Sequence, residues 1–136
     1  RSSAMATEIT YRRASRLEVQ ALAGGPVDYP VHAFAAVEAD EPLAYYGLAW
    51  RFGRCDLWLS VVDASGSKRC AIRVVREARR MLNVAMALGE ARVFCIRDEY
   101  PNSRKLLGAV GFRYLGDVAV TMDDGSEAVK EEWVYG

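Results

Sequence analysis

The spacing of apolar residues along the chain predicts an alternation of strands and helices. Short runs rich in β-branched and aromatic residues, each bounded by turn residues, predict strands at 7–13, 31–38, 43–52, 55–62, 91–97, 111–122 and 130–135. The runs between 31 and 62 are separated only by short turns. This stretch therefore predicts an antiparallel meander.

Other segments carry a helical period. The segment 68–88 predicts a long amphipathic helix that ends at Gly89. One of its faces is apolar (Ile72, Val75, Leu82 and Ala85), and the other, which we call the arginine face, carries Arg69, Arg73, Arg76 and Arg80. Shorter helices are predicted within 15–25, where Ser15 is a suitable N-cap, and at 103–110.

The order of these elements predicts a mixed α/β (α+β) fold, with one mixed, mostly antiparallel sheet and helices on both faces. The chain has 136 residues, which fits a single domain over 5–136. Residues 1–4 precede Met5 and are expected to be a cloning remnant.

Charge and cysteine usage narrow the function classes. Lysine and arginine total 18, as do aspartate and glutamate, so no net charge favours nucleic acid or a membrane. Cys55, Cys70 and Cys95 form no CxxC pair and His32 is the only histidine, so no metal site is predicted. The odd cysteine count indicates a reducing setting, and we expect a cytoplasmic protein.

The loop before the long helix suggests an anion site. Small residues at 64–67 precede Lys68 and Arg69, at a helix N-terminus whose first N–H groups have no partner within the helix. This arrangement suits a diphosphate-bearing cofactor. The alternative interpretation is that Ser67 only caps the helix and that the two bases form a solvated first turn.

Two surface features also have two interpretations. The arginine face is either a solvated helix face or a contact for nucleic acid or an acidic partner, and the zero net charge favours the former. The aromatic residues Tyr45, Tyr46, Trp50 and Trp58 either mark a partner surface or alternate into the core, and we favour the core.

The stretch from Leu57 to Gly116 resembles the GCN5-related N-acetyltransferase (GNAT) family. The similarity lies in a cofactor strand LWLSVV, the strand–helix loop DASGSKRC, the strand ARVFCIR, the helix SRKLLGAV and a strand that opens on Gly-Phe, GFRYLGD. The resemblance implies the GNAT fold, whose sheet is splayed at the centre between the strands ending near Val62 and beginning near Ala91. It also implies acetyl-CoA as co-substrate, no metal, and acetyl transfer to an amine of an unassigned small-molecule or protein acceptor.

The resemblance also implies site residues. The pantetheine arm of acetyl-CoA would pair with the backbone of Ser60, Val61 and Val62. The diphosphate would lie on the loop and first helical turn, at Ser65, Gly66, Ser67, Lys68, Arg69 and Cys70. In this family a base removes a proton from the amine and an acid protonates the departing thiolate.

The catalytic candidates are Tyr100 and Glu99, next to Asp98, although all three also suit a turn before Pro101. The place of the family's tyrosine acid falls on Leu107, which cannot donate a proton. Glu38 and Asp40 are weaker candidates for the base, and His32 on its apolar strand fits a structural role better. Gly111 is expected to permit a tight reversal and Phe112 to anchor the next strand in the core.

A second function therefore stays open. The loop SGSKRCA has one glycine in a different phase from the family's phosphate loop, and the central block resembles small GNAT-like proteins of tailed phages, including an internal virion or head-assembly protein of the T7 group. That resemblance implies a catalytically degenerate protein acting in virion assembly or as an interaction module, found in the host cytoplasm or the virion. A homodimer, formed through the meander or the last strands, also stays open.

Overall fold

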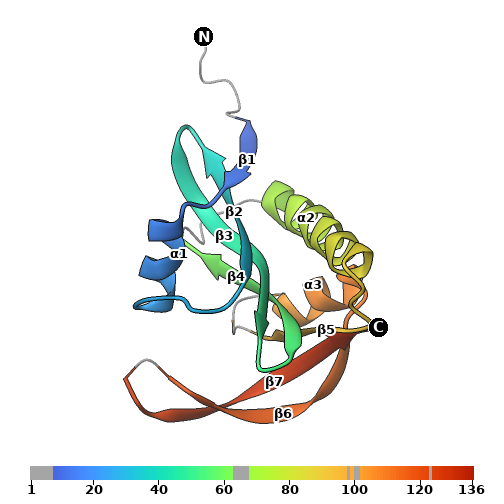
Figure 1. Ribbon diagram of the computed structural model, residues 1–136. Coiled ribbons are helices and arrows are strands. Elements are labelled where there is room, and N and C mark those ends of the chain that lie inside the picture. Colours follow the sequence, from blue (N-terminus) through green and yellow to red (C-terminus); the bar gives the residue numbers. More distant parts are fainter. Residues whose placement is uncertain (1–7, 63–67, 98, 100–101, 123) are drawn as a thin grey trace.

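The computed structural model describes residues 8–62, 68–97, 99, 102–122 and 124–136 (Figure 1). The described elements follow the predicted order: β1 (Ile9–Arg13), α1 (Arg16–Ala23), β2 (Val31–Glu38), β3 (Glu41–Arg51), β4 (Arg54–Val61), α2 (Lys68–Ala87), β5 (Val93–Ile96), α3 (Ser103–Val110), β6 (Arg113–Thr121) and β7 (Glu127–Tyr135). The strands form one sheet in the order β1-β2-β3-β4-β5-β7-β6. The predicted fold class is confirmed.

The predicted meander is also confirmed. Strands β1 to β4 pair with their neighbours in antiparallel fashion, and β4 then pairs with β5 in parallel. Both hairpins of the meander turn through two residues of positive φ, Ala39-Asp40 and Phe52-Gly53. Such turns match the twist of the flanking strands. Asp40, a weak candidate for the base, is therefore an exposed turn residue.

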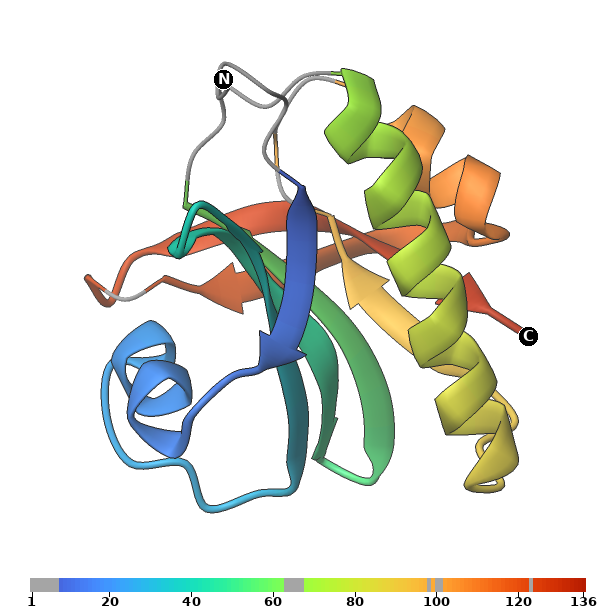
Figure 2. The same ribbon diagram turned by 90° about the horizontal axis from the view of Figure 1, so that it is seen from above.

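Two consecutive tyrosines on β3 hold helices on opposite faces of the sheet. The Tyr45 hydroxyl donates to Glu18 of α1 (2.6 Å), and the Tyr46 hydroxyl donates to Glu77 of α2 (2.5 Å). Successive side chains on a strand point to opposite faces, so α1 and α2 must lie on different sides. Figure 2 shows α1 on one face and α2 with α3 on the other. We call these the α1 face and the α2 face.

Arg80 of the arginine face is exposed, as predicted for a solvated face, and it also makes contacts within the protein. The Arg80 guanidinium lies 4.7 Å from the centre of the Phe34 ring and pairs with Glu77 at 3.0 Å. The preceding residue, Arg79, donates to the Ala109 carbonyl of α3 at 2.7 Å. These arginines therefore help to dock α2 as well as to cover it with charge.

The main core lies under α2 and α3. It joins strands from both halves of the sheet to these helices, through Tyr46, Leu48, Cys55, Met81, Leu82, Ala85, Val93, Val110 and Phe112. Tyr46 lies in this cluster and Trp50 packs against it, which confirms the core interpretation for these two of the four aromatics. Burial raises the pKa of the Cys55 thiol to about 12, so this cysteine is an inert packing residue.

The Gly-Phe joint is an architectural reversal, as expected. Gly111 ends α3 in the left-handed conformation (φ 113°), and its N–H donates to the carbonyls of Leu107 and Gly108. Phe112 then enters the core only 4% exposed, with its ring 5.9 Å from that of Tyr135. A Cβ on Gly111 would lie 2.9 Å from Tyr135 Cε1, so the position requires glycine for both space and backbone angle.

We predict that Gly111→Ala destabilises the fold by about 1–3 kcal/mol, because alanine there is both strained and crowded. Gly108→Ala is the matched control, since it lies in the interior of the same helix and a Cβ there meets nothing within 4 Å. That variant should be neutral or stabilised by up to about 1 kcal/mol. Urea unfolding of both variants checks this, and equal effects would contradict the assignment of Gly111.

Candidate functional site

Strands β4 and β5 pair over only a short distance. The described ladder consists of Cys55 with Val93 and Asp56 with Phe94, whereas β4 pairs with β3 up to Val61. Beyond the ladder, β5 continues in contact with β7, through Cys95–Trp133 and Ile96–Glu132. The sheet is thus splayed between β4 and β5, as the predicted fold requires. We call this feature the parting.

The direction of the backbone groups of β4 follows from its pairing with β3. The Val62 N–H donates to the Leu43 carbonyl at 2.8 Å. In an antiparallel pair, residues alternate in bonding to the partner strand. Val62 and Ser60 therefore direct their backbone groups to β3, and Leu59 and Val61 direct theirs into the parting. Of the three residues predicted to pair with pantetheine, Val61 has this orientation, which Leu59 shares.

The predicted diphosphate site is only partly described. Ser65, Gly66 and Ser67 lie outside the described residues. Lys68 begins α2, and Lys68, Arg69 and Cys70 form its first turn, with side chains outside the described part of the structure. The described part of this site is therefore its backbone. Helix α2 starts six residues after Val62, so its N-terminus follows the end of β4 in the chain.

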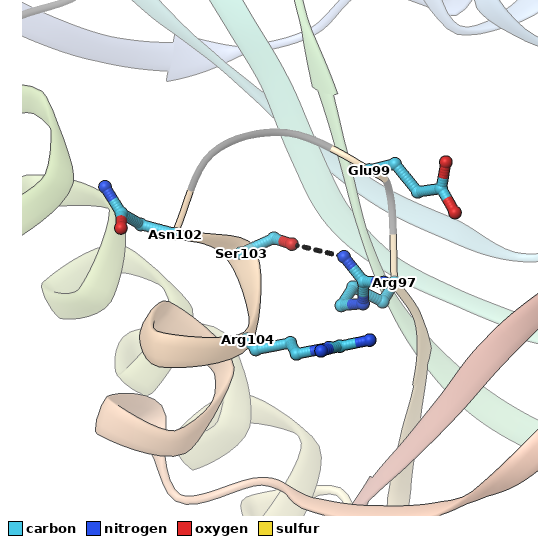
Figure 3. Close-up of a pocket in the computed structure, with 5 residues that line it drawn as sticks. All are labelled: Arg97, Glu99, Asn102, Ser103 and Arg104. Carbon is cyan, nitrogen blue, oxygen red and sulfur yellow. Dashed lines mark hydrogen bonds between the residues drawn. The ribbon is translucent and has the colours of Figure 1, made fainter.

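A pocket of about 380 Å³ lies where β5 ends and α3 begins. It is lined by Arg97, Glu99, Asn102, Ser103 and Arg104 (Figure 3). Figure 3 shows Arg97, Ser103 and Arg104 turned toward one another, with Glu99 directed away from them. Glu99 is exposed, and Tyr100, the other predicted catalytic residue, lies outside the described residues. Their catalytic roles stay predictions.

Glu131 of β7 binds two of the arginines that line this pocket. Arg97 donates to both of its carboxylate oxygens (2.9 and 3.3 Å), Arg104 pairs with it, and Trp133 Nε1 donates at 3.1 Å. The two guanidiniums, Arg104 first, lower the pKa of Glu131 to about 2. Arg97 also donates to Ser103 Oγ at 2.9 Å, and Ser103 is the buried polar residue of the described structure. The cluster locks the start of α3 to β7.

A second charged cluster lies on the α1 face, at the base of the parting. Arg54 donates to Asp56 at 2.9 Å and pairs with Glu132 at 2.7 Å. Its guanidinium lies 4.3 Å from the centre of the Phe94 ring, so it crosses β5 from β4 to β7. We call Arg54, Asp56 and Glu132 the acid–arginine bridge. Burial raises the pKa of Asp56, although the pairing with Arg54 opposes this effect.

Sequence reasoning had missed both charged clusters. Their acidic members Glu131 and Glu132 are adjacent in the chain, and strand alternation sends them to opposite faces. The placement of β7 beside β5 brings them to the parting. The i, i+2 spacing of Arg54 and Asp56 was visible in the sequence, but the strand order was not.

Of the remaining candidates, Leu107 and His32 make packing contacts and Glu38 lies at a hairpin. Leu107, at the place of the family's acid, packs against the core. The His32 ring packs edge-on against Phe34 with the centres 4.8 Å apart, and burial lowers its pKa. Glu38 lies at the end of β2, paired in register with Glu41 in the first hairpin.

Among the described residues, no group of three or more His, Cys, Asp or Glu side chains is placed to hold a metal ion. Across the same part of the chain, every helix is too short or too polar to cross a bilayer.

Searches of protein-family models and of curated proteins find no match to this sequence. Solved structures do share its fold. An N-acetyltransferase from Staphylococcus aureus Mu50 is 12% identical, with a TM-score of 0.67 over 94% of this chain and 97% of that one. The ribosomal-protein-S18-alanine N-acetyltransferase from Escherichia coli is 13% identical, with a TM-score of 0.65 over 94% and 93%.

A third similar structure is AAC(6′)-Ib in complex with paromomycin and acetyl-CoA, which is 14% identical with a TM-score of 0.61 over 93% of this chain and 92% of that one. At these identities the likeness shows the fold alone. The fold is that of the GNAT acetyltransferases, as the sequence predicted.

We predict that Glu131→Gln destabilises the protein in a pH-dependent way. The pKa of Glu131 is about 2 in the folded state, below the ordinary value near 4.3, so its ionised form stabilises the fold above that ordinary value and this contribution is lost as the pH falls toward 2. Urea unfolding should show a larger difference between wild type and variant at about pH 7 than at about pH 3.

The matched control is Glu127→Gln, which removes an exposed carboxylate at the start of the same strand. Its effect on the free energy of unfolding should be small at both pH values. An effect of Glu131→Gln that is equal at the two pH values would contradict the pairing described for Glu131.

Proposed function

We propose that this protein transfers an acetyl group from acetyl-CoA to an amine. The single observation that supports this most strongly is the parting, because it leaves backbone groups of β4 without a partner in the described structure, on the strand that leads to the start of α2. Those unpaired groups belong to Leu59 and Val61, and they are suited to pair with the two amide groups of a pantetheine arm. The solved structures with the same fold are acetyltransferases.

The proposed orientation of the co-substrate follows from chain direction. The diphosphate would lie at the N-terminus of α2, where unpaired N–H groups and Lys68 and Arg69 meet it. An extended arm would then run down the edge of β4 past Val61 and Leu59. The acyl group would lie near the base of the parting, where an N–H group of β4 would polarise its carbonyl.

A second function is favoured by one observation. Leu107 occupies the place of the family's acid and is packed against the core, so no side-chain acid is offered there. A catalytically degenerate protein would not transfer the acetyl group, whether it binds acetyl-CoA or not. It would act as an assembly or interaction module. The narrower resemblance to phage proteins stays a prediction.

We predict that acetyl-CoA binds to the wild-type protein and that binding weakens in the double variant Lys68→Ala/Arg69→Ala. Loss of two charged contacts to the diphosphate should raise Kd about 10- to 100-fold. Isothermal titration calorimetry at low ionic strength gives the Kd values. Free thiol release, measured with a panel of primary amines, then separates transfer from binding alone.

The matched control is Arg16→Ala/Arg92→Ala, which removes two exposed charges at the start of α1 and just before β5. Its Kd should stay within about threefold of wild type if the effect is local rather than due to net charge. Absence of any heat with wild type at millimolar acetyl-CoA would refute the proposed function. Binding without transfer to any amine would favour the degenerate alternative.

A further inference from the structure

Asp56 is the last residue of β4 that pairs with β5, opposite Phe94. Its position therefore marks the base of the parting, where β4 and β5 separate. Asp56 pairs with Ala49 in the ladder with β3, and in the same ladder Tyr45 pairs with Ser60, an even number of residues away. Since Tyr45 reaches α1, Asp56 also presents its side chain on the α1 face.

The α1 face is the side of the parting from which a second substrate can approach. The α2 face is filled there by α2, α3 and the main core, which includes Cys55 and Val93 at the first rung of the ladder. By contrast, the side chain of Asp56 keeps 25% of its surface accessible to solvent. A small amine arriving on this face would therefore meet the carboxylate directly or through one water.

The acid–arginine bridge holds this carboxylate in place and sets its charge. The bridge contains two carboxylates and one guanidinium, so with all groups ionised its net charge is −1. Asp56 is faced by Arg54 on its own strand, by Glu132 on β7 and at longer range by Arg51 on β3, while β5 presents the uncharged Phe94. A cationic amine is attracted to such a site, and an anionic one is not.

We propose that Asp56 is the base that accepts the proton of the acceptor, and that the acceptor is a primary amine that is cationic in solution. This inference rests on the proposed acetyltransferase function. Glu132 and Arg54 are positioning residues in it, because they fix the Asp56 carboxylate without accepting the proton. Burial, which raises the pKa of Asp56, brings the carboxylate closer to the range of an effective base.

The proposed step conserves atoms and charge. The ammonium group gives one proton to the Asp56 carboxylate, which leaves a neutral amine and a neutral Asp56. The nitrogen lone pair forms the C–N bond to the thioester carbonyl carbon, the C–S bond breaks, and coenzyme A leaves as a thiolate. The proton that nitrogen loses as the amide forms passes to the thiolate through water, and Asp56 returns its proton to solvent.

The test compares Asp56→Asn with Glu132→Gln, which removes the other carboxylate from the same guanidinium. The rate of free thiol release from acetyl-CoA is measured from about pH 6 to about pH 9.5, with spermidine and an alanine-initiated tetrapeptide as probe amines. In wild type the Asp56 carboxylate accepts the proton, so the rate should stay high at the low-pH end of this range. In Asp56→Asn it should fall about 10²- to 10³-fold near neutrality and keep rising with pH, as the free amine becomes available.

Glu132→Gln should keep the shape of the wild-type profile, and Asp56→Glu should recover part of the rate. The assignment is overturned if Asp56→Asn keeps the wild-type profile, or if Glu132→Gln rather than Asp56→Asn loses the low-pH limb. If wild type binds acetyl-CoA but transfers to neither probe, NMR decides: the Asp56 side-chain carboxyl carbon must shift on addition of butylammonium in the presence of coenzyme A, and no shift overturns the proposal. If wild type does not bind acetyl-CoA, the proposed function itself fails.

Discussion

Two residue pairs between β4 and β5 are the constraint on which the rest of this molecule depends. Cys55–Val93 and Asp56–Phe94 join the two halves of the sheet, and every described feature of the candidate site lies at or just beyond them. A longer ladder would occupy the backbone groups of Leu59. A shorter one would separate Cys55 from Val93 in the core, which depends on both halves for its closure.

The charges around the parting are divided between its two faces. On the α2 face, one carboxylate, Glu131, is shared by Arg97 and Arg104. On the α1 face, one guanidinium, Arg54, is shared by two carboxylates. Adjacent residues of β7 thus belong to a cluster of net positive charge and a cluster of net negative charge. The parting therefore has a positively charged cluster on one face and a negatively charged cluster on the other.

The sequence predicted the elements well because their signals are local. The N-cap at Ser15, the glycine stops and the apolar period of α2 each act within a few residues, and the structure contains all of them. The Gly-Phe joint was predictable for the same reason. Glycine suits the backbone angle and the limited space at position 111, and Phe112 is the first apolar residue after it.

The candidate site was less predictable because it depends on strand order. The insertion of β7 between β5 and β6 joins Glu132 to Arg54 across 78 residues of sequence, and no local pattern encodes that contact. One contact of Arg80 was not predictable for a similar reason. Helical periodicity placed Arg80 on a solvated face, and its side chain is exposed, but the periodicity gave no sign that the guanidinium also lies over the Phe34 ring of β2.

Arg54 also has a mechanical consequence. Its side chain begins on one half of the sheet and ends on the other, with Asp56 and Glu132 as its two anchors and Phe94 as the floor between them. Any hinge motion that widens the angle between the halves must stretch or break one of those ion pairs. The reach of a single arginine therefore limits how far the two halves can swing apart.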